Sequence, residues 1–145
     1  DTATTEIYTR LVVAASDVYK RQFAYNLSKY DDIARLYLIS DVLITDYSSV
    51  FFDYANLRRP MLFFTYDLEK YRSVLRGFYI DVEEELPGPM LMTTDEVIGA
   101  LQNIENVVTE YSDKYTAFCD KYCAWEDGTA AKKVVETVFS DKSNK

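Results

Sequence analysis

The chain has 145 residues, of which 48% are hydrophobic and 28% are charged, and its formal net charge is −8. This length and apolar content suit one compact domain or part of a larger protein. The negative charge argues against a nucleic-acid partner, which needs a basic surface, and no apolar run reaches the roughly 20 residues that span a bilayer. We therefore expect a cytoplasmic protein.

The first 22 residues differ in pattern from the rest. The apolar run at 11–15 is too short for the hydrophobic part of a signal peptide. The stretch 16–22 resembles the translated adapter sequence seen at the ends of some gene records. We expect residues 1–22 to be a non-native or disordered leader, 23–139 an α/β domain that is incomplete, and 140–145 a polar tail.

From Phe23 onward, strand-like runs alternate with helical ones. Pro60 ends a helix, and Pro87-Gly88-Pro89 marks a turn. The pattern predicts strands at 23–27, 42–45, 61–64 and 90–93, and helices at 31–40, 48–57, 67–75, from Thr94, 107–123 and 129–139. Such alternation is typical of an α/β fold with a Rossmann-like parallel sheet and flanking helices. Ligands of such sheets bind beyond the carboxyl ends of the strands.

One stretch combines a buried strand, a polar turn and a helix. The apolar run at 42–44 leads into the turn, and Asp46 or Ser48 can cap the helix that follows. Free amides at a helix start bind anions, most often phosphate, although an ordinary capped helix is the alternative reading. The candidate phosphate-binding residues are Thr45, Asp46, Tyr47, Ser48 and Ser49.

Basic residues follow this turn. The segment 58–76 has a local charge of +3, so the remainder carries −11, and an anion would be steered there. Arg76 is the preferred side-chain phosphate ligand, and Gly77 would let the backbone come close to it; a surface salt bridge is the alternative. We expect Asp46 to order the turn, and Asp53 to pair with Arg58 or Arg59.

Other polar residues favour structural roles. Cys119 and Cys123 are four apart on an expected helix, and we read them as small buried residues in a reducing compartment. No His is present to complete a zinc site, so we expect neither a metal nor a cofactor. The acidic run 83–85 is expected to be a solvated loop, and Trp125 a core or interdomain anchor.

Several separated motifs follow one another along the chain. They are Tyr-Leu-Ile-Ser-Asp-Val-Leu-Ile-Thr-Asp-Tyr-Ser-Ser at 37–49, Phe-Asp-Tyr at 52–54, Arg59-Pro60, Tyr66-Asp67, Tyr71, Arg-Gly-Phe-Tyr at 76–79, Leu-Pro-Gly-Pro at 86–89, and Phe-Cys-Asp-Lys-Tyr-Cys at 118–123 with Asp127-Gly128 and Ala130. Together, over about residues 23–139, they resemble the CDP-glycerol glycerophosphotransferases, which polymerise teichoic acid. Their order along the chain makes the resemblance specific.

The resemblance implies a role and its limits. Family members have two facing α/β domains of the GT-B type, and this chain resembles the second, which holds the CDP-glycerol donor. They transfer glycerol phosphate to a lipid-linked poly(glycerol phosphate) acceptor, release CMP, and work at the inner face of the cell membrane. The acceptor and the membrane would meet parts outside this chain. Asp67 and Tyr71 would line a cytidine or glycerol pocket, unless they belong to a capped helix with rings facing the core.

The family also uses two histidines, and this chain has none. The resemblance therefore implies binding without catalysis by this chain alone. A nucleotide-sugar-dependent GT-B glycosyltransferase domain and a non-catalytic α/β interaction module are the alternatives. The motifs do not distinguish CDP-glycerol from CDP-ribitol as the donor. They also do not distinguish a primase from a polymerase.

Overall fold

The computed structural model describes residues 12–13, 25–27, 29–46, 48–68 and 81–139. Its main sheet has three parallel strands in the order β3 (Leu43–Thr45), β4 (Met61–Phe64) and β5 (Met90–Leu91). Ile44 pairs with Leu62 and Phe63 pairs with Met90. A separate parallel pair joins β1 (Val12–Val13) to β2 (Tyr25–Asn26). The predicted parallel α/β architecture is confirmed.

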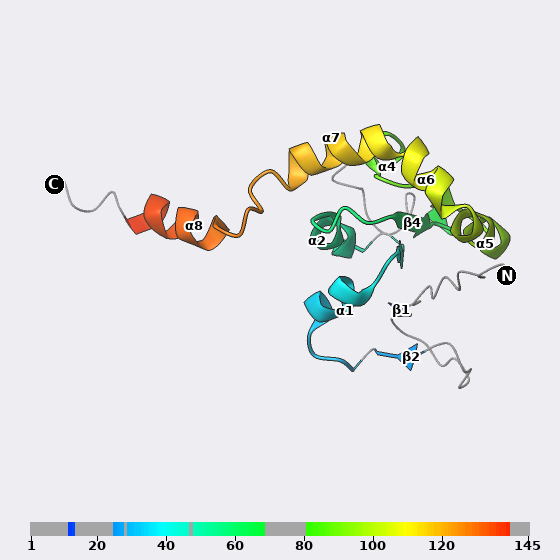
Figure 1. The fold of residues 1–145 in the computed structure, drawn as a ribbon, viewed down its shortest axis with the longest axis horizontal. Coiled ribbons are helices and arrows are strands. Elements are labelled where there is room, and N and C mark those ends of the chain that lie inside the picture. The colour runs from blue at the N-terminus through cyan, green and yellow to red at the C-terminus, as the bar shows by residue number, and fades with distance from the viewer. Residues whose placement is uncertain (1–11, 14–24, 28, 47, 69–80, 140–145) are drawn as a thin grey trace, which may run out of the picture.

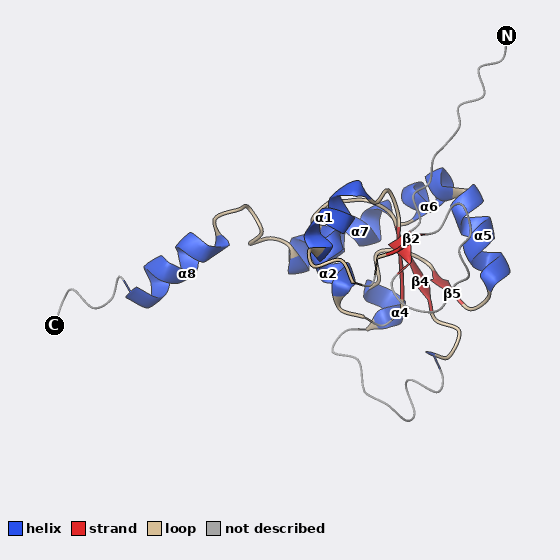
Figure 2. Cartoon of the chain, turned by 90° about the horizontal axis from the view of Figure 1, so that it is seen from below, coloured by secondary structure: helices blue, strands red, loops and turns tan. Residues whose placement is uncertain are grey.

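Helices flank the sheet on both sides. Figures 1 and 2 show α1 and α2 on one side of the strands and α5 on the other, while α8 extends away from the rest. Their bounds are α1 (Ile33–Ile39), α2 (Val50–Ala55), α4 (Val82–Glu85), α5 (Thr94–Gln102), α6 (Ile104–Glu110), α7 (Ser112–Tyr122) and α8 (Ala130–Phe139). The expected helix at 67–75 falls largely outside the described residues.

The core lies where α2 and α7 meet β4. Met61, Leu62 and Phe63 are at most 1% exposed, because a central parallel strand is covered on both faces. Phe51 packs edge-on against Phe63, with ring centroids 5.4 Å apart, and Phe118 of α7 lies 5.8 Å from Phe51. These aromatic contacts hold α2 between the sheet and α7.

The end of α1 is fixed to the rest of the domain by hydrogen bonds. The Tyr54 hydroxyl donates to the Ser40 carbonyl over 2.9 Å. The Arg59 guanidinium donates to the carbonyls of Leu38 and Ser40 over 2.9 and 2.6 Å. The last carbonyls of a helix lack partners within it, so a guanidinium there acts as a cap. Arg59 is therefore not the partner of Asp53, and no ion pair joins Asp53 to Arg58 either, which corrects that expectation.

Three other expectations need correction. The helical stretch expected at 107–123 begins earlier, at Ile104. It consists of two helices, α6 and α7, which are separated at Tyr111. Next to this break the Ser112 hydroxyl donates to the Thr109 carbonyl. The acidic run at 83–85 is not a loop but part of α4. Trp125 is 71% exposed, which excludes the core alternative, and its alternative role as an interdomain anchor stays a prediction. The Lys133 ammonium lies over its ring.

The Pro87-Gly88-Pro89 turn is buried against β4. Pro87 and Gly88 are buried, and Pro89 is partly buried. A Cβ at Gly88 would overlap the backbone carbonyl oxygen of Met61, so only glycine allows this approach. The turn thereby sets β5 beside β4, where the Phe63 amide donates to the Pro89 carbonyl.

Candidate functional site

The turn between β3 and α2 lies at the carboxyl end of the sheet. Asp46, Ser48 and Ser49 are exposed there. The Asp46 carboxylate accepts a 2.9 Å hydrogen bond from the Ser48 amide, so Asp46 orders the turn as expected. The expected capping by Asp46 or Ser48 is wrong: Ser49 is the N-cap of α2, and no side chain bonds to the helix amides from that position.

This turn presents hydrogen-bonding groups to solvent. Because α2 has only six residues, its dipole is weak. The Ser48 amide is already bonded to Asp46, so the Ser49 amide and the hydroxyls of Ser48 and Ser49 are the groups available to a ligand. Thr45 is partly buried at the end of β3, where it anchors the turn in the sheet.

Of the other predicted site residues, the structure describes only Asp67. Asp67 is partly buried and follows β4 just as the 46–49 turn follows β3. The carboxyl ends of parallel strands share one side of the sheet, so Asp67 lies on the side of the turn. Tyr47, Tyr71, Arg76 and Gly77 lie outside the described residues.

Two of the basic residues that were expected to steer an anion lie at the opposite end of the sheet. Arg58 and Arg59 immediately precede β4, so they are at its amino end, away from the 46–49 turn. Arg58 has a left-handed backbone with φ of 52°, and Arg59 caps α1. Neither can serve a ligand at the turn.

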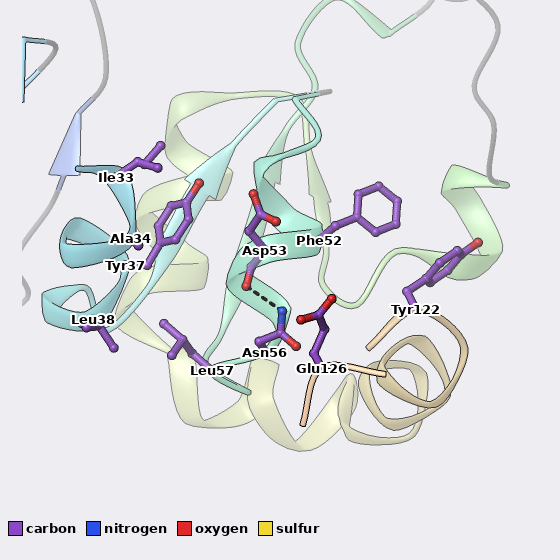
Figure 3. A pocket seen from close by; sticks show the side chains of 10 residues that line it. All are labelled: Ile33, Ala34, Tyr37, Leu38, Phe52, Asp53, Asn56, Leu57, Tyr122 and Glu126. Carbon is purple, nitrogen blue, oxygen red and sulfur yellow. Dashed lines mark hydrogen bonds between the residues drawn. The ribbon is translucent and has the colours of Figure 1, made fainter. Parts of the chain in front are cut away.

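A cavity of about 470 Å³ opens between α1, α2 and the end of α7 (Figure 3). Its polar lining residues include Asp53, Asn56 and Glu126, and Phe52 and Tyr122 form part of its wall. The sequence analysis missed this cavity, because Tyr37 reads as part of the apolar face of α1. No short motif signals a cavity built from three separate segments.

The hydroxyl of Tyr37 is buried in this cavity wall. Within the described part of the chain it has no hydrogen-bond partner. Burial, and after it the charge of Asp53, raises the pKa of Tyr37 above the ordinary 10.0. The phenol therefore stays protonated at neutral pH and is a donor without an acceptor.

The two cysteines are free thiols; the expected burial is confirmed for Cys119, whereas Cys123 is only partly buried. Cys119 is buried, and its thiol lies 3.6 Å from the Ala55 carbonyl. Burial, followed by the neighbouring Cys119, raises the pKa of Cys123 to about 11, which keeps it protonated and unreactive. Among the described residues, no group of three or more His, Cys, Asp or Glu side chains could hold a metal, and no helix is long and apolar enough to cross a membrane.

Comparison with known proteins connects this fold to one family. The sequence model of CDP-Glycerol:Poly(glycerophosphate) glycerophosphotransferase matches residues 10–140, and so begins before Phe23. The teichoic acid poly(glycerol phosphate) polymerase of Bacillus subtilis strain 168 is 55% identical over 117 residues, which are 81% of this chain and 16% of the relative. The teichoic acid poly(ribitol-phosphate) polymerase of Bacillus spizizenii is 40% identical over 117 residues, which are 80% of this chain and 18% of the relative.

Solved structures of the wall teichoic acid polymerase TagF have the same fold. One matches with a TM-score of 0.72 and 44% identity over 82% of this chain and 29% of that chain. A TagF variant soaked with CDPG matches with the same TM-score over 30% of its chain. This chain thus spans less than a third of these relatives. It belongs to the CDP-glycerol:poly(glycerophosphate) glycerophosphotransferase family.

Proposed function

We propose that this chain forms the donor-binding part of a transferase that moves glycerol phosphate from CDP-glycerol to the end of a poly(glycerol phosphate) chain, releasing CMP. The observation that carries the proposal is the 55% identity with a poly(glycerol phosphate) polymerase over four fifths of the chain. The lower identity of 40% with a poly(ribitol-phosphate) polymerase favours glycerol over ribitol as the transferred polyol.

In this proposal the donor diphosphate binds at the carboxyl end of the sheet. The Ser49 amide and the hydroxyls of Ser48 and Ser49 donate to phosphate oxygens, and the exposure of both residues supports this role. Thr45, Asp46 and Tyr47 shape the turn. Arg76 adds a bidentate guanidinium contact beside Gly77, and Asp67 and Tyr71 line the cytidine or glycerol pocket.

The chemistry follows from the donor. A terminal hydroxyl of the acceptor chain attacks the β-phosphorus of CDP-glycerol, the bond to the bridging oxygen breaks, and CMP leaves with that oxygen. Amides and guanidinium groups offset the charge that develops on CMP. Because the chain contains no His, we place the proton acceptor, the lipid-linked acceptor chain and contact with the inner membrane face in other parts of a longer protein. The chain alone is expected to bind without turnover.

Calorimetric titration of the chain with CDP-glycerol tests the proposal, with circular dichroism to establish that the sample is folded. We expect saturable binding that is tighter than for CDP-ribitol or a nucleotide sugar. Tighter binding of a nucleotide sugar would favour a glycosyltransferase domain. A flat titration with every nucleotide, from a folded sample, would favour a non-catalytic interaction module.

A further inference from the structure

A second cavity, of about 180 Å³, lies between the segment that precedes β4 and the junction of α6 and α7. Arg58 and Pro60 line it on one side, and Val108, Ser112 and Thr116 line it on the other. Because residues 58–60 are at the amino end of β4, this cavity is at the opposite end of the strands from the 46–49 turn. It is therefore separate from the site proposed for the donor.

The charged residues of this cavity are all positive. Arg58 and Arg59 line it and no Asp or Glu does, although the net charge of the chain is −8. The Arg59 guanidinium is engaged by the carbonyls at the end of α1. Arg58 is exposed, and its side chain forms no ion pair or hydrogen bond within the described part of the chain. A ligand in solution can therefore reach a guanidinium that has no counter-ion.

The charge of Arg58 lies near α7. Burial raises the pKa of Tyr115, and it raises the pKa of Cys123 to about 11; in both cases the positive charge of Arg58 opposes the rise. Both groups stay neutral at pH 7, so neither neutralises Arg58. The Tyr115 hydroxyl also donates to the Arg59 carbonyl over 2.8 Å, which holds α7 against the segment before β4. The two walls of the cavity are thus tied together by the fold.

Two hydroxyl groups give the cavity hydrogen-bond acceptors. The Ser112 hydroxyl donates to the Thr109 carbonyl over 3.0 Å, and the Thr116 hydroxyl donates to the Ser112 carbonyl over 2.9 Å. Each hydroxyl proton is therefore used within the helices, and each oxygen keeps lone pairs that can accept from a ligand. Ser112 and Thr116 are both exposed residues, so these oxygens are accessible from solution.

These groups select a ligand that carries a negative charge and hydroxyl groups together. A metal ion or an amine is disfavoured, because the lining has two guanidinium groups and no carboxylate. An apolar ligand would remove water from Arg58 without pairing its charge. A phosphate group matches a guanidinium in a bidentate way, and hydroxyl groups on neighbouring carbons can donate to Ser112 and Thr116.

We propose that this cavity binds a phosphorylated polyol, with Arg58 as the ligand of the phosphate and Ser112 and Thr116 as acceptors for the polyol. The site is additional to the 46–49 turn and does not rest on the proposed function. A free polyol phosphate and one unit of a polyol phosphate polymer present the same groups, so either can occupy it.

Nuclear magnetic resonance titration of the isotope-labelled 145-residue chain tests the site. The probes are glycerol 3-phosphate, inorganic phosphate and glycerate, which keeps the hydroxyl groups but replaces phosphate by carboxylate. Each is added in the presence of excess CDP-glycerol, so that the 46–49 turn is occupied. Shifts of the Ser112 and Thr116 amides report on the cavity, and those of the Ser48 and Ser49 amides report on the turn.

Two substitutions with matched controls separate the phosphate from the polyol contacts. Arg58→Gln removes the charge, and Arg35→Gln removes an equal charge from an exposed residue outside the cavity. Thr116→Val removes a hydroxyl from the cavity. Thr109→Val is its control, since the Thr109 hydroxyl also donates to a helix carbonyl, that of Glu105, over 2.9 Å but does not line the cavity. Circular dichroism establishes that each variant is folded.

We expect glycerol 3-phosphate to shift the Ser112 and Thr116 amides saturably and to bind more tightly than inorganic phosphate or glycerate. Arg58→Gln should lower the affinity for both phosphate probes by about tenfold, as for the loss of a charged hydrogen bond. Thr116→Val should lower only the affinity for glycerol 3-phosphate, by about 2- to 12-fold, and both controls should bind normally. Tighter binding of a glycerol phosphate oligomer than of the monomer assigns the site to a polymer, and equal affinity assigns it to the free ester.

The absence of saturable shifts at Ser112 and Thr116, or unchanged affinity in Arg58→Gln, overturns the inference. Unchanged affinity in Thr116→Val, or tighter binding of glycerate than of glycerol 3-phosphate, also overturns it, because the ligand is then not recognised as a phosphorylated polyol. The response of Ser48 and Ser49 to CDP-glycerol tests the proposed function separately, so either proposal can fail while the other stands.

Discussion

Arg59 donates a 2.6 Å hydrogen bond to the carbonyl oxygen of Ser40, 19 residues earlier in the chain. The same nitrogen is 2.9 Å from the Leu38 carbonyl. One guanidinium at the start of β4 therefore caps the last turn of α1. The Tyr54 hydroxyl reaches the same Ser40 carbonyl, so α1, α2 and β4 meet at one acceptor.

The first prediction concerns this cap. Arg59→Ala leaves the last α1 carbonyls without their charged donor, and we expect the free energy of unfolding to fall by about 1.5–3 kcal/mol. Urea denaturation followed by circular dichroism measures the change. The control is Arg35→Ala, which removes an exposed ion pair with Asp32 and should change stability by less than about 1 kcal/mol. Equal effects from the two substitutions would contradict a special role for Arg59.

A second prediction compares two glycines. Gly88→Ala forces a Cβ into the Met61 backbone carbonyl, which no side-chain rotation can relieve, so we expect a loss of several kcal/mol, more than about 2 kcal/mol. Gly99 lies inside α5 with nothing within 4 Å of an added Cβ. Gly99→Ala should raise stability by about 0.5–1 kcal/mol, because alanine favours the helix. Thermal unfolding of the two variants measures both changes in stability. A Gly88→Ala protein as stable as the wild type would refute the close approach of residue 88 to the Met61 carbonyl.

A third prediction concerns pH. The Glu85 carboxylate accepts a 2.6 Å hydrogen bond from the Lys121 ammonium and a 2.7 Å hydrogen bond from the Tyr122 hydroxyl. These hydrogen bonds lower the pKa of Glu85 from 4.5 to about 2. A lowered pKa in the folded state stabilises the protein above the unfolded pKa, and the stabilisation disappears as the pH falls through the folded pKa. The contribution is therefore complete above about pH 4.5 and is lost toward pH 2.

Glu85→Gln tests this linkage. We expect the variant to be less stable than the wild type at pH 7, and the difference to shrink as the pH falls from 4.5 to 2. Urea midpoints across this range measure it. Glu84→Gln on the same helix is the control, since Glu84 is exposed. A difference between wild type and Glu85→Gln that does not vary with pH would rule out the carboxylate as its source.

A fourth prediction concerns the donor. Arg76→Ala should weaken CDP-glycerol binding by about 1–3 kcal/mol, because a charged hydrogen bond to phosphate is lost. Calorimetry with the chain measures the change, and Arg35→Ala serves as a control of equal charge on α1. Wild-type affinity in Arg76→Ala would remove that residue from the site.

The local patterns predicted most of the secondary structure. Apolar runs located β3 and β4, and the helix expected from Thr94 is α5. The structure shows that Thr93 caps this helix, its hydroxyl accepting from the Glu96 amide. The partners of Arg59 could not be predicted, because the Leu38 and Ser40 carbonyls lie about twenty residues away in the sequence. Pairing across such distances depends on tertiary packing, which periodicity does not encode.

The candidate site, too, was predictable only where it is formed by neighbouring residues of the sequence. The 46–49 turn is a continuous segment, so its residue types identified it. The cavity at Tyr37 and Asp53 is assembled from α1, α2 and the end of α7, and only packing brings these segments together. The binding roles of all the predicted site residues stay predictions, those in the 45–49 turn and Asp67 as well as Tyr71, Arg76 and Gly77.

The Arg59 cap and the 46–49 turn lie at opposite ends of the same short strands. Substitutions that stabilise the domain at the amino end can therefore be made separately from substitutions in the turn that we propose to bind the donor. Directed evolution of this domain could first raise the free energy of unfolding through substitutions around residues 58–60. The added stability would then compensate for destabilising substitutions that are tested for new donor specificity.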